Sequence, residues 1–258
     1  MNYIPNTDAD RAAMLQAIGV GSVDELFHDV PAALRYPTLD LPPAWSELEA
    51  QREMQALSDR NRDLNHASCF LGAGAYRHFI PSVVDFVISR SEFYTSYTPY
   101  QPEISQGTLQ AIFEYQSMIC ALTGMEVANA SHYDGATATA EAVIMALHVQ
   151  RGDRRKVILA PTLHPQYREV VRTYTQGMQL SIVGDETPGN GPGGLAGPEE
   201  LAALCDDGTA AIVVQVPDFL GGVVSPERLR ALAAHAHRCG ALLIAVANPI
   251  ALGLLQPP

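Results

Sequence analysis

The chain has 258 residues, of which 47% are hydrophobic, enough for the packed core of one large or two small α/β domains. Its formal net charge of −12 argues against a nucleic-acid-binding protein and against a protein that docks on anionic membranes. The longest apolar run, at 241–255, is too short to span a bilayer and is interrupted by Asn248 and Pro249.

Residues 1–65 are predicted to form an N-terminal helical arm. The three helices expected in this arm lie at 8–18, 22–30 and 46–62. The second and third begin with the pattern Ser-x-x-Glu, in which the two side chains bond each other's backbone amides and so favour a helix start.

A segment rich in tyrosine and proline follows at 93–105, after a helix that begins at Pro81. Pro99 and Pro102 lack N–H donors and fix φ, so this segment is predicted to be a stiff loop. Binding residues often lie on such loops. The alternative is a buried connector in which the tyrosines only pack. A helix over 105–122, ended by Gly124, comes next.

From residue 126 onward, predicted strands alternate with predicted helices. The strands are expected at 126–128, 156–160, 179–184, 210–216 and 241–247. The helices are expected at 136–150, 165–176, 198–205 and 226–239. The strands are continuous apolar runs, which is typical of strands buried on both faces. The pattern predicts right-handed βαβ units, and hence an α/β domain over 66–258 with a mostly parallel sheet covered on both faces.

Two of the predicted helix starts lie where open parallel sheets bind ligands. His164 is a candidate binding residue at one of them, and a purely local hydrogen-bonding role is the alternative. Thr137 is a candidate at the other, where the first amides of a helix could hold a phosphate. The neighbouring Asp134 favours a plain helix cap instead, because a carboxylate there would repel a phosphate.

No metal site is predicted. The four cysteines are far apart in sequence and form no Cys-x-x-Cys pair, which indicates neither a zinc site nor a disulfide framework and suits a reducing cytoplasm. His235 and His237 lie two residues apart on a predicted helix, so their side chains point to different faces, and we expect both to be surface histidines.

Several motifs together resemble one protein family. They are Phe-Leu-Gly-Ala-Gly-Ala-Tyr76, Tyr97-Thr-Pro-Tyr-Gln-Pro-Glu-Ile-Ser-Gln-Gly107, Asn129-Ala-Ser and Tyr133-Asp-Gly-Ala-Thr-Ala. They resemble the N-terminal half of glycine dehydrogenase (decarboxylating), the P-protein of the glycine cleavage system, in its split form as subunit 1. The resemblance implies the fold of pyridoxal phosphate (PLP)-dependent transferases, fold type I. It also implies a reaction in which glycine loses its carboxylate and its aminomethyl group passes to the lipoyl group of H-protein.

The chain lacks the residues that PLP chemistry requires, a lysine for the Schiff base and a carboxylate at the pyridine nitrogen. Its only lysine, Lys156, opens a predicted strand, at the end opposite to the ligand-binding edge. Asn248 stands where the fold type carries its aspartate. The resemblance therefore implies that PLP is bound covalently by subunit 2, within a heterotetramer, and that this chain alone is inactive.

By resemblance, the loop at 97–107 reaches a shared pocket for PLP and glycine. The candidate pocket residues are Tyr97, Tyr100, Gln101, Glu103, Ser105 and Gln106. The glutamines could hydrogen-bond a carboxylate without adding charge, whereas Glu103 could instead cap the amides near Ser105. Two rival readings remain: a non-catalytic scaffold that stabilises subunit 2 and docks H-protein, and a stand-alone binding protein for a small acid.

The fold type also implies a sheet of seven strands in the order 3-2-4-5-6-7-1, of which this chain supplies the first five. We therefore expect a truncated piece of a longer subunit, without the remaining strands and the C-terminal small domain. The strand at 241–247 would then have an unpaired edge, and the chain alone would be prone to aggregate or only partly ordered.

Overall fold

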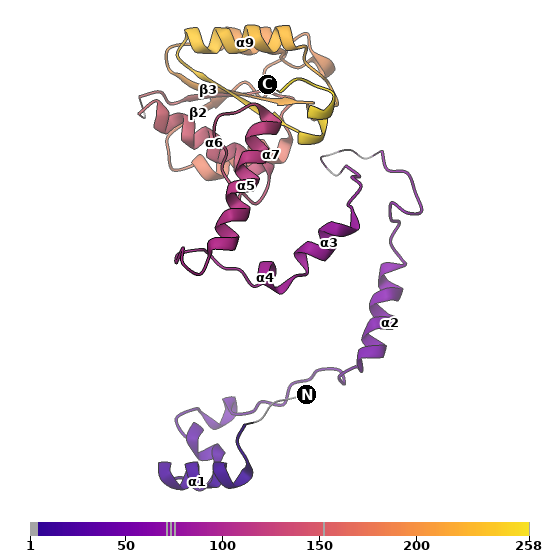
Figure 1. Ribbon diagram of the computed structural model, residues 1–258, viewed down its shortest axis with the longest axis vertical. Coiled ribbons are helices and arrows are strands. Elements are labelled where there is room, and N and C mark those ends of the chain that lie inside the picture. Colours follow the sequence, from indigo (N-terminus) through magenta and orange to yellow (C-terminus); the bar gives the residue numbers. More distant parts are fainter. Residues whose placement is uncertain (1–4, 71, 73, 75, 152, 258) are drawn as a thin grey trace. The chain divides into compact units, whose positions relative to one another are not determined.

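The computed structural model describes residues 5–70, 72, 74, 76–151 and 153–257. The chain divides into two units, Met1–Ala67 and Ser68–Pro258 (Figure 1). No helix within the described ranges is both long and apolar enough to cross a membrane.

The first unit is helical and consists of α1 (Asp8–Ile18), η1 (Val23–Phe27), η2 (Ala32–Leu34) and α2 (Glu47–Ser58). The predicted capping box opens α2, where the Glu49 amide donates to the Ser46 hydroxyl over 3.3 Å. The predicted helix at 22–30 is a shorter 3₁₀ turn, and Ser22 makes no side-chain cap. None of the described residues in this unit is buried, so the unit has no hydrophobic core of its own.

The second unit begins with α3 (Ser82–Ile88), α4 (Ser91–Tyr94) and α5 (Gln106–Thr123). α5 ends as predicted at Gly124, whose φ of +73° lies in the left-handed region that glycine adopts most easily. The segment between α4 and α5 is neither helix nor strand, as its two prolines predict.

Within the part of the chain that the structure describes, the sheet has four parallel strands in the order β2-β1-β3-β4, and this order agrees with the fold type. The strands are β1 (Lys156–Leu159), β2 (Ser181–Val183), β3 (Thr209–Val216) and β4 (Leu242–Ala247). The predicted strand at 126–128 is wrong, because this segment is irregular. A strand needs a neighbour for its backbone groups, and here the Ala128 carbonyl instead accepts a hydrogen bond from the side-chain amide of Gln116 in α5, over 2.6 Å.

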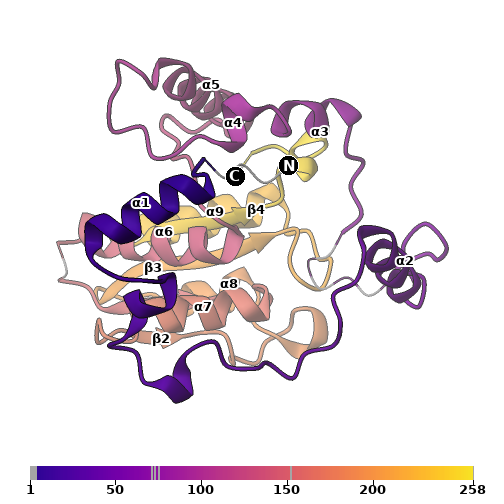
Figure 2. The same ribbon diagram turned by 90° about the horizontal axis from the view of Figure 1, so that it is seen from below.

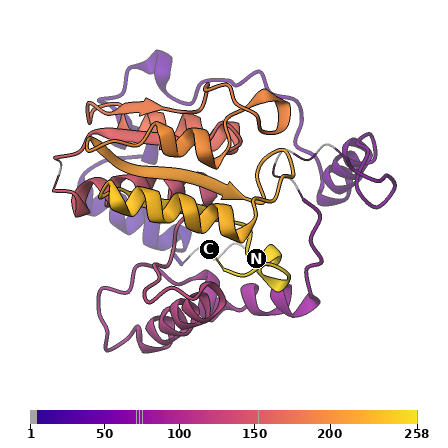
Figure 3. The ribbon, with the colours of Figure 1, turned by 90° about the horizontal axis from the view of Figure 1, so that it is seen from above.

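Helices cover both faces of the sheet, as predicted. They are α6 (Gly135–Val149) and α7 (Pro165–Thr175) on the face seen in Figure 2, and α8 (Pro198–Ala203) and α9 (Pro226–Arg238) on the face seen in Figure 3. Side chains of β1 alternate between the two cores: Val157 and Leu159 pack with α6 and α7, and Ile158 packs with α8 and α9. Among the described residues, β4 pairs with β3 alone, and it is half-buried throughout.

Two 3₁₀ turns complete the unit. They are η3 (Pro192–Gly194), in the glycine-rich segment before α8, and η4 (Pro249–Gly253), directly after β4.

Candidate functional site

The loop between α4 and α5 presents two tyrosines to the surface. Tyr97 is 85% exposed and Tyr100 is 81% exposed, so the buried-connector alternative is wrong for this chain. A turn holds the loop: the Ser105 amide donates to the Gln101 carbonyl over 3.1 Å, and the Tyr100 amide donates to the Thr98 carbonyl over 2.9 Å. The two rings are thus displayed from an ordered backbone.

The other candidate residues of the loop are also accessible. Gln101, Glu103 and Gln106 are exposed, and Ser105 is half-buried at the N-cap position of α5. Within the described residues, neither the Ser105 hydroxyl nor the Glu103 carboxylate accepts a hydrogen bond from the first amides of α5. The capping role considered for Glu103 is therefore not what the structure has.

His164 lies at the carboxyl edge of the sheet and is buried. Its ring stacks on Tyr167 with centroids 4.7 Å apart, and it meets the Phe219 ring edge-on at 4.8 Å. Its Nδ1 accepts the Gln166 amide at the start of α7 over 3.2 Å. A side chain at Gly74 would come within 2.9 Å of Nε2, so the backbone there lies close to the ring. These contacts are consistent with the local role that the sequence left open, and a binding role for His164 stays a prediction.

The start of α6 is capped by Asp134. Its Oδ1 accepts the Thr137 amide over 2.8 Å and the Thr137 hydroxyl over 2.9 Å. These bonds from Thr137 hold the pKa of the Asp134 carboxyl below its usual range. A carboxylate therefore already binds the amides that would otherwise bind a phosphate, as Asp134 indicated in the sequence.

Tyr167 fills the space next to this helix start. A Cβ on Gly135 would lie 2.4 Å from the Tyr167 hydroxyl oxygen. Burial raises the pKa of Tyr167, and the nearby charge of Asp134 adds to this effect. Tyr167 therefore packs closely against the start of α6.

Lys156 and Asn248 have structural partners. The Lys156 ammonium donates to the Leu204 carbonyl over 2.6 Å and to Asp206 over 2.8 Å, at the start of β1. The Asn248 side-chain oxygen accepts the Ile250 amide over 3.0 Å and caps η4. Together with the cap at Asp134, these contacts show that the residues of this chain do not fit a covalently bound PLP.

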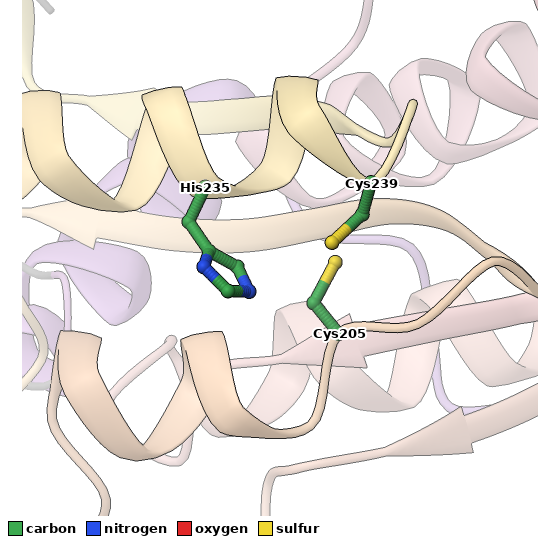
Figure 4. A group of neighbouring side chains, drawn as sticks. All are labelled: Cys205, His235 and Cys239. Carbon is green, nitrogen blue, oxygen red and sulfur yellow. The ribbon is translucent and has the colours of Figure 1, made fainter.

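A cluster that the sequence analysis missed lies at the opposite edge of the sheet. Cys205, His235 and Cys239 each offer one ligand atom, and these atoms all lie within 4.8 Å of one another (Figure 4). The expectation of a surface histidine is correct for the exposed His237 and wrong for the half-buried His235. His235 and Cys239 are four residues apart on a predicted helix, and this spacing could have predicted that their side chains lie on the same face.

A family model described as glycine cleavage system P-protein matches residues 1–258. This chain belongs to the P-protein family. The chain is 52% identical over 258 residues to the probable glycine dehydrogenase (decarboxylating) subunit 1 of Thermomicrobium roseum, covering all of this chain and 56% of that protein. It is 50% identical to the protein of the same name from Geobacillus kaustophilus, covering 99% of this chain and 55% of the relative.

One solved structure supports the same assignment, and a second shares only the fold. The crystal structure of a glycine decarboxylase (P-protein) of the glycine cleavage system, in inhibitor-bound form, superposes with a TM-score of 0.79 at 40% identity. The superposition includes all of this chain and 56% of the chain in that crystal structure. A sphingosine-1-phosphate lyase from Burkholderia pseudomallei shares the fold, with a TM-score of 0.54 at 15% identity over 84% of this chain and 51% of that one.

The family resemblance and the fold are both confirmed by these comparisons: the P-protein chain has the α/β architecture of PLP-dependent enzymes. The chain spans a little over half the length of the curated relatives that it matches.

Proposed function

We propose that this P-protein chain acts as subunit 1 of a glycine decarboxylase in the glycine cleavage system. With a subunit 2 that holds PLP, it decarboxylates glycine and passes the aminomethyl group to the lipoyl group of H-protein, an oxidoreductase step. The observation that carries the proposal is an ordered loop with two exposed tyrosines. The only lysine of the chain forms an ion pair with Asp206, away from this loop.

The loop supplies its groups to a pocket completed by the partner. Tyr97 and Tyr100 offer ring faces for packing and hydroxyls for hydrogen bonds, and both are accessible to a second chain. A backbone already held by a turn loses little freedom on docking, which favours a precise placement of both hydroxyls.

Neutral polar side chains suit the substrate. Gln101, Ser105 and Gln106 can donate hydrogen bonds to the glycine carboxylate without forming an ion pair. This carboxylate leaves as neutral CO₂, so its negative charge decreases in the transition state. An ion pair with arginine would therefore stabilise the ground state more than the transition state and slow the reaction, whereas neutral donors have a smaller effect of this kind. The loop residues therefore act in binding and orientation.

PLP belongs to the partner in this proposal. The chemistry that PLP supplies when bound is an electron sink for the bond that breaks at the glycine α-carbon. This chain's residues exclude water from that site and orient the substrate. The proposal places the assembly in the cytoplasm, which suits the four free thiols.

A co-expression experiment tests the proposal. Glycine-dependent release of CO₂, with lipoyl H-protein as acceptor, is measured for this chain alone, for subunit 2 alone and for the two together. We expect turnover only for the pair. Full activity of subunit 2 alone would contradict the proposal.

The second candidate is a scaffold that stabilises subunit 2 and docks H-protein. His164 packs against Tyr167 and Phe219 at the carboxyl edge of the sheet, where open parallel sheets bind ligands, and this packing is the observation that favours the scaffold. The tyrosine variants described in the Discussion distinguish the two.

A further inference from the structure

Three potential metal ligands converge from two helices that are far apart in sequence. Cys205 follows the C-terminal end of α8, whereas His235 and Cys239 lie one turn apart at the end of α9. Figure 4 shows the two sulfur atoms facing each other, with the His235 ring on the same side of α9. All three residues are half-buried. This arrangement is a compact set of two sulfurs and one imidazole nitrogen.

The backbone around the cluster is held firmly. The Cys239 amide donates to the His235 carbonyl over 3.1 Å, and the Arg154 guanidinium donates to the Cys239 carbonyl. The Cys205 amide donates to the Ala202 carbonyl over 3.0 Å. Cys205 also packs against the core beneath α8 and α9. The three side chains are therefore presented from fixed positions.

The donor set selects the metal. Two thiolates and one imidazole suit Zn²⁺, which prefers a tetrahedral set of sulfur and nitrogen ligands. With Zn–S bonds of about 2.3 Å and a Zn–N bond of about 2.0 Å, ligand atoms in such a set lie about 3.5 to 3.8 Å apart. The three ligand atoms lie within 4.8 Å of one another, so they would move closer together when they bind the ion. We propose that Cys205, His235 and Cys239 bind one Zn²⁺, with a water molecule as the fourth ligand.

Binding is a ligand exchange with no change of oxidation state. Zn²⁺ forms bonds to both sulfurs and to one imidazole nitrogen, keeps one of its water ligands, and displaces the two thiol protons into solvent. Two thiolates neutralise the ion, so the site adds no net charge next to the Arg154 guanidinium.

The position of the site indicates a structural role. Cys205 and Cys239 precede β3 and β4, so the site lies at the amino edge of the sheet, opposite to His164 and Asn248. Glu199 and Arg228 already join the N-terminal parts of α8 and α9 through an ion pair. The metal would join the C-terminal ends of the same two helices and so stabilise their packing on the sheet.

The test uses the full chain, purified under reducing conditions with any partner that co-purifies. After removal of metal with a chelator, Zn²⁺ or Co²⁺ is titrated into the wild type and the variants. We expect one ion per chain, two protons released per Zn²⁺ in weakly buffered solution, and a higher Tm. Co²⁺ is expected to give thiolate-to-metal absorption and the visible bands of a tetrahedral site.

Matched variants locate the ion. Cys205→Ser, Cys239→Ser and His235→Asn are expected to lose the Co²⁺ absorption and the rise in Tm. His237→Asn changes an exposed histidine on the same helix, and Cys120→Ser removes a thiol elsewhere, so both are expected to bind like the wild type. Circular dichroism of the metal-free proteins verifies that the variants fold.

A measurement without variants covers the case in which a substitution prevents folding. Zn²⁺ is expected to protect two thiols of the wild-type chain from a thiol reagent, compared with the metal-free chain. Unchanged thiol reactivity, stoichiometric binding that persists in the Cys205→Ser/Cys239→Ser double variant, or a Cys205–Cys239 disulfide in the protein as isolated would overturn the proposal.

Discussion

The ammonium of Lys156 lies 2.8 Å from the carboxylate of Asp206, and this ion pair engages the only lysine of the chain at the start of β1. The lysine side chain is 23% exposed, and its second bond goes to the Leu204 carbonyl. The hydrogen bond from Lys156 also holds the pKa of the Asp206 carboxyl below its usual range. These contacts hold the Lys156 ammonium at the amino edge of the sheet, away from the carboxyl edge where open parallel sheets bind ligands.

The first prediction is that PLP added to the isolated chain produces no absorption band of a lysine Schiff base. The physical reason is the position of Lys156 and its two hydrogen bonds. Absorption spectra before and after borohydride treatment measure this, and subunit 2 serves as the positive control. A band that disappears in Lys156→Ala would refute the prediction.

The second prediction concerns the two exposed tyrosines. In the complex with subunit 2, Tyr97→Phe and Tyr100→Phe are expected to lower glycine decarboxylation by about 10²-fold, as is typical when a positioned polar contact at a reacting centre is lost. Tyr174→Phe, at a partly exposed position on α7, is the matched control and should keep the wild-type rate. Gel filtration measures assembly, which should be unchanged in all three. Wild-type turnover in both loop variants would favour the scaffold function.

The third prediction concerns the contact between Gly135 and Tyr167. Gly135→Ala places a methyl group 2.4 Å from the Tyr167 hydroxyl oxygen and should destabilise the second unit by about 1 to 3 kcal/mol, the usual cost of overpacking. Gly107→Ala, in the first turn of α5, meets no atom within 4 Å and is the control. Urea unfolding of the two variants measures the difference. Equal midpoints would show that Tyr167 moves away without cost.

The fourth prediction is a pH dependence from Glu199. The hydrogen bonds from Arg228 lower the pKa of the Glu199 carboxyl to about 2, below its value in the unfolded chain. A lowered pKa in the folded state means that the stabilisation is present above the unfolded pKa of about 4.3 and is lost as the pH falls toward 2. Both side chains are at least half exposed, so the contribution is at most about 1 kcal/mol.

Melting temperatures of the wild type and Glu199→Gln between pH 6 and pH 3 test this dependence. The difference between the two proteins should shrink as the pH falls, and 1 M salt at pH 6 should also reduce it because exposed charges are screened. A difference that grows on acidification would contradict the assignment of the pair. Arg238→Gln, at the far end of α9, is a control for the loss of a charge.

Local signals in the sequence predicted many of the elements. Three of these signals act on the backbone within a few residues: the helix cap at Ser46, the helix end at Gly124 and the prolines of the loop. Their effects can therefore be predicted without any tertiary contact. The apolar runs of β1 and β3 predicted burial on both faces, and the motifs of the loop predicted the family.

Tertiary structure decided the remaining features. Whether 126–128 forms a strand depends on a neighbour that no local pattern can supply, and the Ala128 carbonyl bonds to Gln116 instead. The role of His164 depends on Tyr167 and Phe219, the latter from a distant segment.

The sequence by itself determined the family, through the resemblance of its motifs. It also determined the parallel α/β fold and the lack of a well-placed lysine, because these follow from residue types and from periodicity along the chain. Only the tertiary structure decided that Cys205 meets His235 and Cys239, because 30 residues separate Cys205 from the nearer of them and the packing of α8 against α9 sets their approach. Local propensity acts over a few residues, whereas a site assembled from two helices exists only after both have packed on the sheet.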